Sequence, residues 1–119
     1  MSTNPYCENI PPYLSTLNFL SGKKNYYEVE QKIQTYLRRN DITYTFEPEF
    51  CSFVCTQNYD SENERIDVIN IYWNPLVETH VIEVRRLKGD ILYQCSKSKN
   101  FHNIFMELKI YLTEVQPLV

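Results

Sequence analysis

The sequence predicts an α+β fold in which a helix, a four- to five-stranded antiparallel meander and a second helix follow one another. Segments with the two-residue alternation of strands occupy the middle of the chain and are joined by short links, as in antiparallel sheets. Segments with the spacing of amphipathic helices stand on either side of them. Each helix has one narrow apolar stripe, so we expect both helices to pack on one face of the sheet.

The chain has 119 residues, which is enough for one two-layer core. We therefore expect one domain over residues 25–112. A proline-rich stretch without a sustained period precedes it and predicts an N-terminal arm over residues 1–24. Residues 113–119, which include a proline, are expected to form a C-terminal tail.

The first helix is predicted to begin after Asn25, whose side chain can cap the amides of the first turn. Glu28 stands at the third helical position and completes a capping-box pattern. The apolar face consists of Val29, Ile33, Tyr36 and Leu37. The helix ends at Arg38 and Arg39, which oppose its negative pole, and Asn40 suits a left-handed exit.

Four strands are predicted between the helices, at residues 42–46, 50–56, 66–73 and from residue 81 onward. The third of them is apolar on both faces, which indicates a central position in the sheet. Residues 91–93 are a candidate fifth strand. The second helix is predicted from about residue 100 to 112, with an apolar stripe of Phe101, Ile104, Phe105, Leu108 and Leu112.

Composition argues against several classes of function. Two glycines are too few for a glycine-rich phosphate loop, and the net charge of −3 opposes nonspecific nucleic-acid binding. The acidic residues lack the ligand spacing of an EF-hand, and the two histidines form no recognisable catalytic or metal-binding pattern. We therefore expect no enzyme activity, no cofactor, no metal site and no nucleic-acid partner.

The cysteines favour a reducing compartment. Two of the four, Cys51 and Cys55, fall in one predicted strand about 13 Å apart, too far for a disulfide between them. The N-terminus lacks the profile of a secretion signal, and no stretch approaches the roughly 18 to 20 apolar residues of a membrane span. We expect buried free thiols and a cytoplasmic protein, with a peripheral membrane location as the alternative.

The remaining signal is a basic set at the end of the fourth strand. Its members are Arg85, Arg86, Lys88, Lys97 and Lys99. Because strand residues alternate between faces, Arg85 and Arg86 cannot point to the same side of a regular strand. Arg86 either turns outward at the end of the sheet or pairs with an acid at the edge of the core. The set is either an anion-binding patch or a solvated rim that protects a strand edge.

Taken in order, these elements resemble the kinase-associated domain 1, a module at the C-terminus of microtubule-affinity-regulating and AMP-activated-type kinases. The resemblance covers roughly residues 25–112 and rests on LRRNDITYTFEPEFCSFVC, INIYWNP, VIEVRRLKGD and FHNIFMELKIYL. It implies a noncatalytic domain. Members of that family bind anionic phospholipids through the basic strand end, and some dock onto a kinase domain.

Within this resemblance, Arg85 and Arg86 match the basic pair of the family. The chain departs from the family pattern where Glu83 replaces a frequent base and Lys88 a frequent serine. About ten additional residues also stand between Gly89 and the last helix.

Two interpretations of the function follow. The first is a regulatory or scaffolding module that binds a protein partner, such as a kinase, through the tyrosine-rich sheet face left open by the helices. The second is a peripheral membrane module that binds anionic phospholipids through Arg85, Arg86, Lys88, Lys97 and Lys99. The net acidity, Glu83 and the additional loop residues favour the first.

Overall fold

A computed structural model describes residues 4–58, 64–88 and 101–113 of the chain. Over these residues, a five-stranded antiparallel sheet is accompanied by two α-helices and one turn of 3-10 helix. The elements are β1 (Asn18–Leu20), α1 (Tyr26–Arg39), β2 (Thr43–Glu47), η1 (Pro48–Phe50), β3 (Ser52–Asn58), β4 (Glu64–Asn74), β5 (Thr79–Lys88) and α2 (Phe101–Thr113). The order of strands in the sheet is β1-β5-β4-β3-β2. The predicted α+β class and the helix, sheet, helix order are confirmed.

β4 is the central strand, as its apolar character on both faces predicts. It pairs with β3 on one side and with β5 on the other, both antiparallel. Alternation places Ile69 and Ile71 in the core with the helices, whereas Val68 and Tyr72 lie on the opposite face. We call this opposite face the open face of the sheet.

The fifth strand of the described sheet comes from the stretch expected as an N-terminal arm. β1 pairs antiparallel with β5, and Phe19 lies opposite Ile82. Phe19 is buried and packs edge-on against Phe105 of α2, with ring centroids 5.8 Å apart. Three residues are too few for a strand to show alternation in sequence, so pairing and packing alone reveal β1. The candidate strand at residues 91–93 lies outside the described residues.

α1 begins after Asn25 and ends at Arg39, as its sequence predicts. The left-handed residue that follows the helix lies one position later than predicted. The Asn25 side chain accepts hydrogen bonds from the amides of Tyr27 and Glu28, at 2.9 and 3.3 Å. At the other end, the left-handed residue is Asp41, with φ of 54°, and not Asn40. Asn40 instead donates a hydrogen bond from its side chain to the Tyr36 carbonyl, at 2.9 Å, and so caps the last turn.

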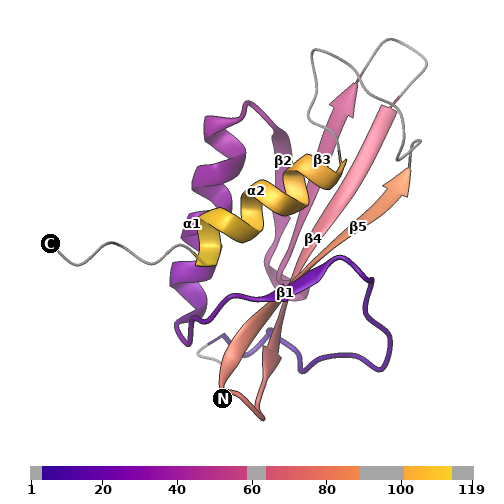
Figure 1. The fold of residues 1–119 in the computed structure, drawn as a ribbon. Coiled ribbons are helices and arrows are strands. Elements are labelled where there is room, and N and C mark those ends of the chain that lie inside the picture. Colours follow the sequence, from indigo (N-terminus) through magenta and orange to yellow (C-terminus); the bar gives the residue numbers. More distant parts are fainter. Residues whose placement is uncertain (1–3, 59–63, 89–100, 114–119) are drawn as a thin grey trace, which may run out of the picture.

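Both helices lie on the same side of the sheet (Figure 1). Their buried side chains share one core with alternate residues of β3, β4 and β5. From α1 and α2 these are Val29, Ile33, Leu37, Ile104, Leu108 and Leu112, and from the strands Phe53, Ile69, Ile71, Ile82 and Val84. The helices thus cover one face, and the open face is the place where strand side chains are available for other contacts.

His80 makes the stability of this fold depend on pH. Its ring is fully buried against Trp73 and Tyr26, and its Nδ1 lies 2.9 Å from the Lys23 carbonyl oxygen. Burial lowers the pKa of His80, although the hydrogen bond to Lys23 opposes this shift. The unfolded chain therefore takes up a proton before the folded chain does. We expect the free energy of unfolding to fall as the pH drops below about 6.5, the ordinary histidine pKa.

Urea unfolding followed by the fluorescence of Trp73, the single tryptophan, measures this dependence at about pH 7.5 and about pH 5.5. A His80→Gln variant is less stable at both values but has a smaller difference between them. An equal difference in the wild type and the variant would show that another group is responsible.

Candidate functional site

The two arginines predicted as an anion site lie on opposite faces of β5. Arg86 extends to the helix side, where its guanidinium forms a salt bridge with the buried carboxylate of Asp67. Arg65 lies on the other side of that carboxylate, with its Nε 3.4 Å from Asp67 Oδ2. Burial raises the pKa of Asp67, and the two guanidinium groups oppose that rise. Arg86 therefore follows the second predicted alternative and pairs with an acid at the edge of the core.

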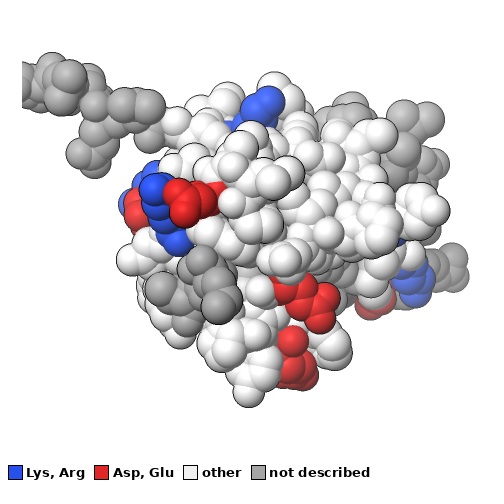
Figure 2. Space-filling view, turned by 90° about the horizontal axis from the view of Figure 1, so that it is seen from below, with Lys and Arg blue, Asp and Glu red and all other residues white. Residues whose placement is uncertain are grey.

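Of the other predicted bases, the two that the structure describes, Arg85 and Lys88, do not join Arg86 on one surface. Arg85 is exposed on the open face, across from Val68. Lys88 forms an exposed ion pair with Glu64, at 3.7 Å. Lys97 and Lys99 lie outside the described residues. Figure 2 shows one end of the molecule, where basic side chains occupy separate places and a group of acidic side chains stands apart from them.

This arrangement predicts weak attachment to anionic membranes. A base near an anionic leaflet contributes about 1 kcal/mol, but Arg86 is largely buried in its salt bridge with Asp67, and Lys88 is paired with Glu64. In cosedimentation at physiological salt, we expect equal pelleting with phosphatidylcholine vesicles and with vesicles that contain phosphatidylserine. A salt-sensitive excess on the phosphatidylserine vesicles, lost in an Arg85→Gln variant, would contradict this expectation.

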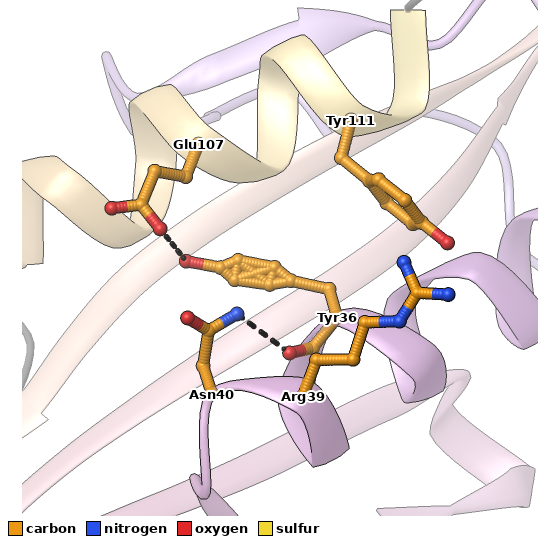
Figure 3. Close-up of a pocket in the computed structure, with 5 residues that line it drawn as sticks. All are labelled: Tyr36, Arg39, Asn40, Glu107 and Tyr111. Carbon is orange, nitrogen blue, oxygen red and sulfur yellow. Dashed lines mark hydrogen bonds between the residues drawn. The ribbon is translucent and has the colours of Figure 1, made fainter.

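A pocket of about 200 Å³ lies between the end of α1 and α2 (Figure 3). It is lined by Tyr36, Arg39, Asn40, Glu107 and Tyr111. The Tyr36 hydroxyl donates to Glu107 Oε1 at 3.2 Å, and burial beside Glu107 raises the pKa of Tyr36 and keeps this proton in place. Arg39 lies over the Tyr111 ring, 6.0 Å from its centroid. The polar groups of the pocket contact one another across the two helices, so we assign the pocket to helix packing.

A larger hollow of about 530 Å³ lies on the open face of the sheet. We call it the sheet-face hollow. It is lined by Glu8, Glu47, Phe50, Ser52, Val54, Ile66, Val68, Asn70, Ile71, Tyr72 and Leu87. Its volume is within the range of known ligand pockets, roughly 300–1,000 Å³.

The sheet-face hollow has an apolar body and a polar end. Val54 and Val68 are cross-strand partners in its middle. Phe50 and Leu87 are 66% and 64% exposed, which is unusual for large apolar side chains that line a concave surface. Ser52 lies opposite Asn70 at the start of β3, and its hydroxyl donates to the Asn70 side-chain oxygen. The hollow therefore offers apolar contact together with hydrogen-bonding groups.

Two carboxylates complete the lining, Glu8 from the N-terminal arm and Glu47 from the end of β2. Glu47 pairs with Ser52 across the strands, which places it at the polar end. The Glu8 carbonyl accepts a hydrogen bond from the Trp73 amide at 2.8 Å, which places Glu8 beyond Asn70 along β4. The polar end is therefore also acidic and suits a cationic group.

Glu83 holds the arm against the open face beside the hollow. Its carboxylate is fully buried and accepts hydrogen bonds from the Ser15 amide at 2.6 Å and from the Asn70 side chain at 3.0 Å. The Tyr72 hydroxyl donates to it at 3.4 Å, and burial beside Glu83 raises the pKa of Tyr72. Kinase-associated domain 1 sequences often have a base at the position that corresponds to Glu83. In this chain the acid at that position holds the N-terminal segment through the Ser15 amide.

Sequence patterns did not identify the residues of this hollow, beyond the expectation that the open face binds a partner. Glu8 reaches it through the arm, and Phe50 reaches it through η1, which ends in the left-handed residue Cys51. Glu8 belongs to no periodic segment, and Phe50, expected as the first residue of the strand at 50–56, lies in η1 because β3 begins at Ser52. The proline at position 48, which interrupts the strand pattern, is the one local signal that Phe50 departs from regular alternation.

Nothing in the described part of the chain points to metal chemistry, since no three histidine, cysteine or acidic side chains are grouped to hold an ion. Across the same residues, no helix has the length and apolar character needed to cross a bilayer. No protein-family model and no curated protein matches the chain.

Proposed function

We propose that this chain is a noncatalytic interaction module that binds a segment of a protein partner in the sheet-face hollow. The observation that supports this most strongly is the pair of exposed apolar side chains, Phe50 and Leu87, in the lining of an apolar concave surface. When a partner covers the exposed part of either side chain, the binding free energy gains about 1–2 kcal/mol, roughly two-thirds of the value for burying such a side chain fully.

The lining determines the chemistry of the segment that fits. Apolar side chains of the partner pack on Val54, Val68 and Leu87, and a lysine or arginine at one end of the segment faces Glu8 and Glu47. Such charge complementarity fixes the direction in which a segment lies more than it raises the affinity. The expected ligand is therefore a short amphipathic segment with two or three large apolar residues followed by a base.

The shape and charge of the hollow favour a protein partner over a membrane. A bilayer surface is flat on this scale and cannot fill a hollow of about 530 Å³. Glu8 and Glu47 also repel an anionic leaflet. A kinase as the partner, and a regulatory role toward it, follow from the resemblance to the kinase-associated domain 1 and stay predictions.

Selection from a random peptide display library tests the proposal, because it requires no candidate partner. The immobilised wild-type chain is the target, and the binding of each enriched peptide to a Leu87→Asp variant is measured afterwards. We expect enriched peptides to combine large apolar residues with a lysine or arginine at one end, and to bind with micromolar affinity.

A second variant tests the charge at the polar end. In Glu47→Lys, the side chain in the acidic end of the hollow changes sign, while the apolar lining is retained. Peptides with a basic end lose affinity for this variant, and peptides in which that base is replaced by an acid regain it. Enriched peptides that bind the wild type and both variants equally would refute the proposal, as would a library that yields no binders.

A further inference from the structure

Cys7 and Cys51 lie side by side against β4, although they are far apart in sequence. The register of β3 with β4 continues to Cys51, whose carbonyl accepts a hydrogen bond from the Ile71 amide at 3.1 Å. The N-terminal arm runs parallel to β4, with Asn9 bridged to Trp73, so Cys7 is also level with Ile71. Cys7 Sγ accordingly lies 3.6 Å from the Ile71 carbonyl oxygen.

Both cysteines lie along the same edge of β4. The Ile71 amide donates to the Cys51 carbonyl, and the Trp73 amide donates to the carbonyl of Glu8, the residue after Cys7. Because amides two residues apart in a strand point to the same side, both contacts are on one edge of β4. The Cys7 thiol is the main group that lowers the pKa of Cys51, as expected of a close neighbour. Both cysteines therefore contact the same residue of β4, Ile71, which brings them to one place on the sheet.

The surroundings of Cys51 favour its thiolate. The neighbouring Cys7 thiol lowers the pKa of Cys51 to about 7, and the Tyr26 side chain adds to this effect, although burial opposes it. Burial raises the pKa of Tyr26, so its hydroxyl stays protonated beside Cys51. Cys55, in β3, differs from Cys51 because burial raises the pKa of its thiol to about 12. A thiolate is the reactive form of cysteine in disulfide exchange.

We propose that Cys7 and Cys51 form a reversible disulfide that fixes the N-terminal arm to the sheet beside the acidic end of the sheet-face hollow. The oxidant is a low-molecular-weight disulfide such as oxidised glutathione. Cys7 is the half-buried member of the pair and is the one that this oxidant reaches first, whereas Cys51 is fully buried.

The exchange balances in two steps. Cys7 gives its proton to the Cys51 thiolate and attacks one sulfur of oxidised glutathione, which breaks that S–S bond and releases a glutathione thiolate. The released glutathione thiolate takes up the Cys51 proton, and the Cys51 thiolate then attacks the sulfur of Cys7. The mixed disulfide breaks, and the second glutathione leaves as a thiolate. Two protein thiols are oxidised to one disulfide, and one glutathione disulfide is reduced to two thiols.

The disulfide also controls the binding surface, an effect that rests on the proposed function. Glu8 follows Cys7 directly and lines the hollow, so a covalent bond at Cys7 holds this carboxylate in place. Preorganisation of a binding group removes part of the ordering cost of association. We expect oxidation to tighten the binding of a base-ended peptide about two- to tenfold, the effect of immobilising one side chain in advance.

Mass spectrometry of the full chain, in a Cys95→Ser background, tests the bond itself. After incubation with oxidised glutathione, we expect the chain to lose the mass of two hydrogens and to give one linked peptide pair that contains Cys7 and Cys51. A Cys7→Ser variant does not lose this mass, whereas a Cys55→Ser variant still does. Cys7 is only half buried, so its replacement leaves the core intact.

Two results would overturn the inference. One is a chain that gains only glutathione adducts at Cys7, without a link to Cys51. The other is a linked chain whose affinity for the selected peptides equals that of the reduced chain, which would remove the effect on the hollow. The mass measurement needs no ligand, so the bond is established or refuted even where the library yields no binder and the proposed function fails.

Discussion

Replacing Asp67 with asparagine is expected to lower the free energy of unfolding by about 3–5 kcal/mol, the usual effect of removing one partner from a buried ion pair. The Asp67 side chain is 2% exposed, and the paired Arg65 and Arg86 side chains are 1% and 7% exposed. Asparagine keeps the shape of the side chain but leaves both guanidinium groups without this carboxylate. Urea unfolding followed by Trp73 fluorescence measures the loss.

The exposed ion pair between Lys88 and Glu64 is the matched control, because it joins the same two strands. A Glu64→Gln variant is expected to change the free energy of unfolding by at most about 1 kcal/mol, since solvent screens an exposed pair. If Asp67→Asn and Glu64→Gln have the same small effect, the buried pair does not hold β4 and β5 together at the edge of the core.

A double variant, Phe50→Ser with Leu87→Asp, is expected to weaken the binding of selected peptides by about 100-fold or more. The two side chains are the exposed apolar members of the sheet-face hollow, and each loss costs about 1.4 kcal/mol or more if it contributes as an interface hot spot. Because both side chains are largely exposed in the free chain, the fold tolerates the changes. Isothermal titration calorimetry gives the affinities, and unfolding curves verify the fold.

Exposed apolar residues outside the hollow provide the control for this double variant. Leu76, in the turn between β4 and β5, is 92% exposed, and Ile110 of α2 is 61% exposed. Leu76→Asp and Ile110→Asp variants are expected to bind the same peptides with unchanged affinity. A comparable loss in the control variants would mean that apolar contact anywhere on the surface, and not the hollow, explains binding.

The regular elements were predictable because their signals are local. Asn25 and the spacing of the apolar residues after it fix the start and the buried face of α1. β4 is apolar on both faces because its side chains contribute to the helix core on one face and to the apolar lining of the hollow on the other. Alternation along β5 also separates Arg85 from Arg86, whichever groups they contact.

The N-terminal arm was predicted, but its pairing with the sheet was not predictable, since long-range contacts hold it. β1 pairs with β5, and the segment at Asn9 pairs with β4, but neither has a hydrophobic period of its own. The bonds of Glu83 to Ser15 and of Cys7 to the Ile71 carbonyl connect positions more than 60 residues apart. Pairwise contacts of this kind leave no pattern in a single sequence, so the acidic end of the hollow and the pair of thiols appear only in three dimensions.

The account depends most on the claim that the open face of the sheet is the binding surface. The most direct measurement is the NMR chemical shift of labelled methyl groups during titration with a selected base-ended peptide. The account predicts that the shifts of Val54, Ile66, Val68 and Leu87 change, while those of Ile33 and Leu112 in the helix core do not. Changes centred on the helices, or around the pocket between Arg39 and Tyr111, with an undisturbed open face would contradict it.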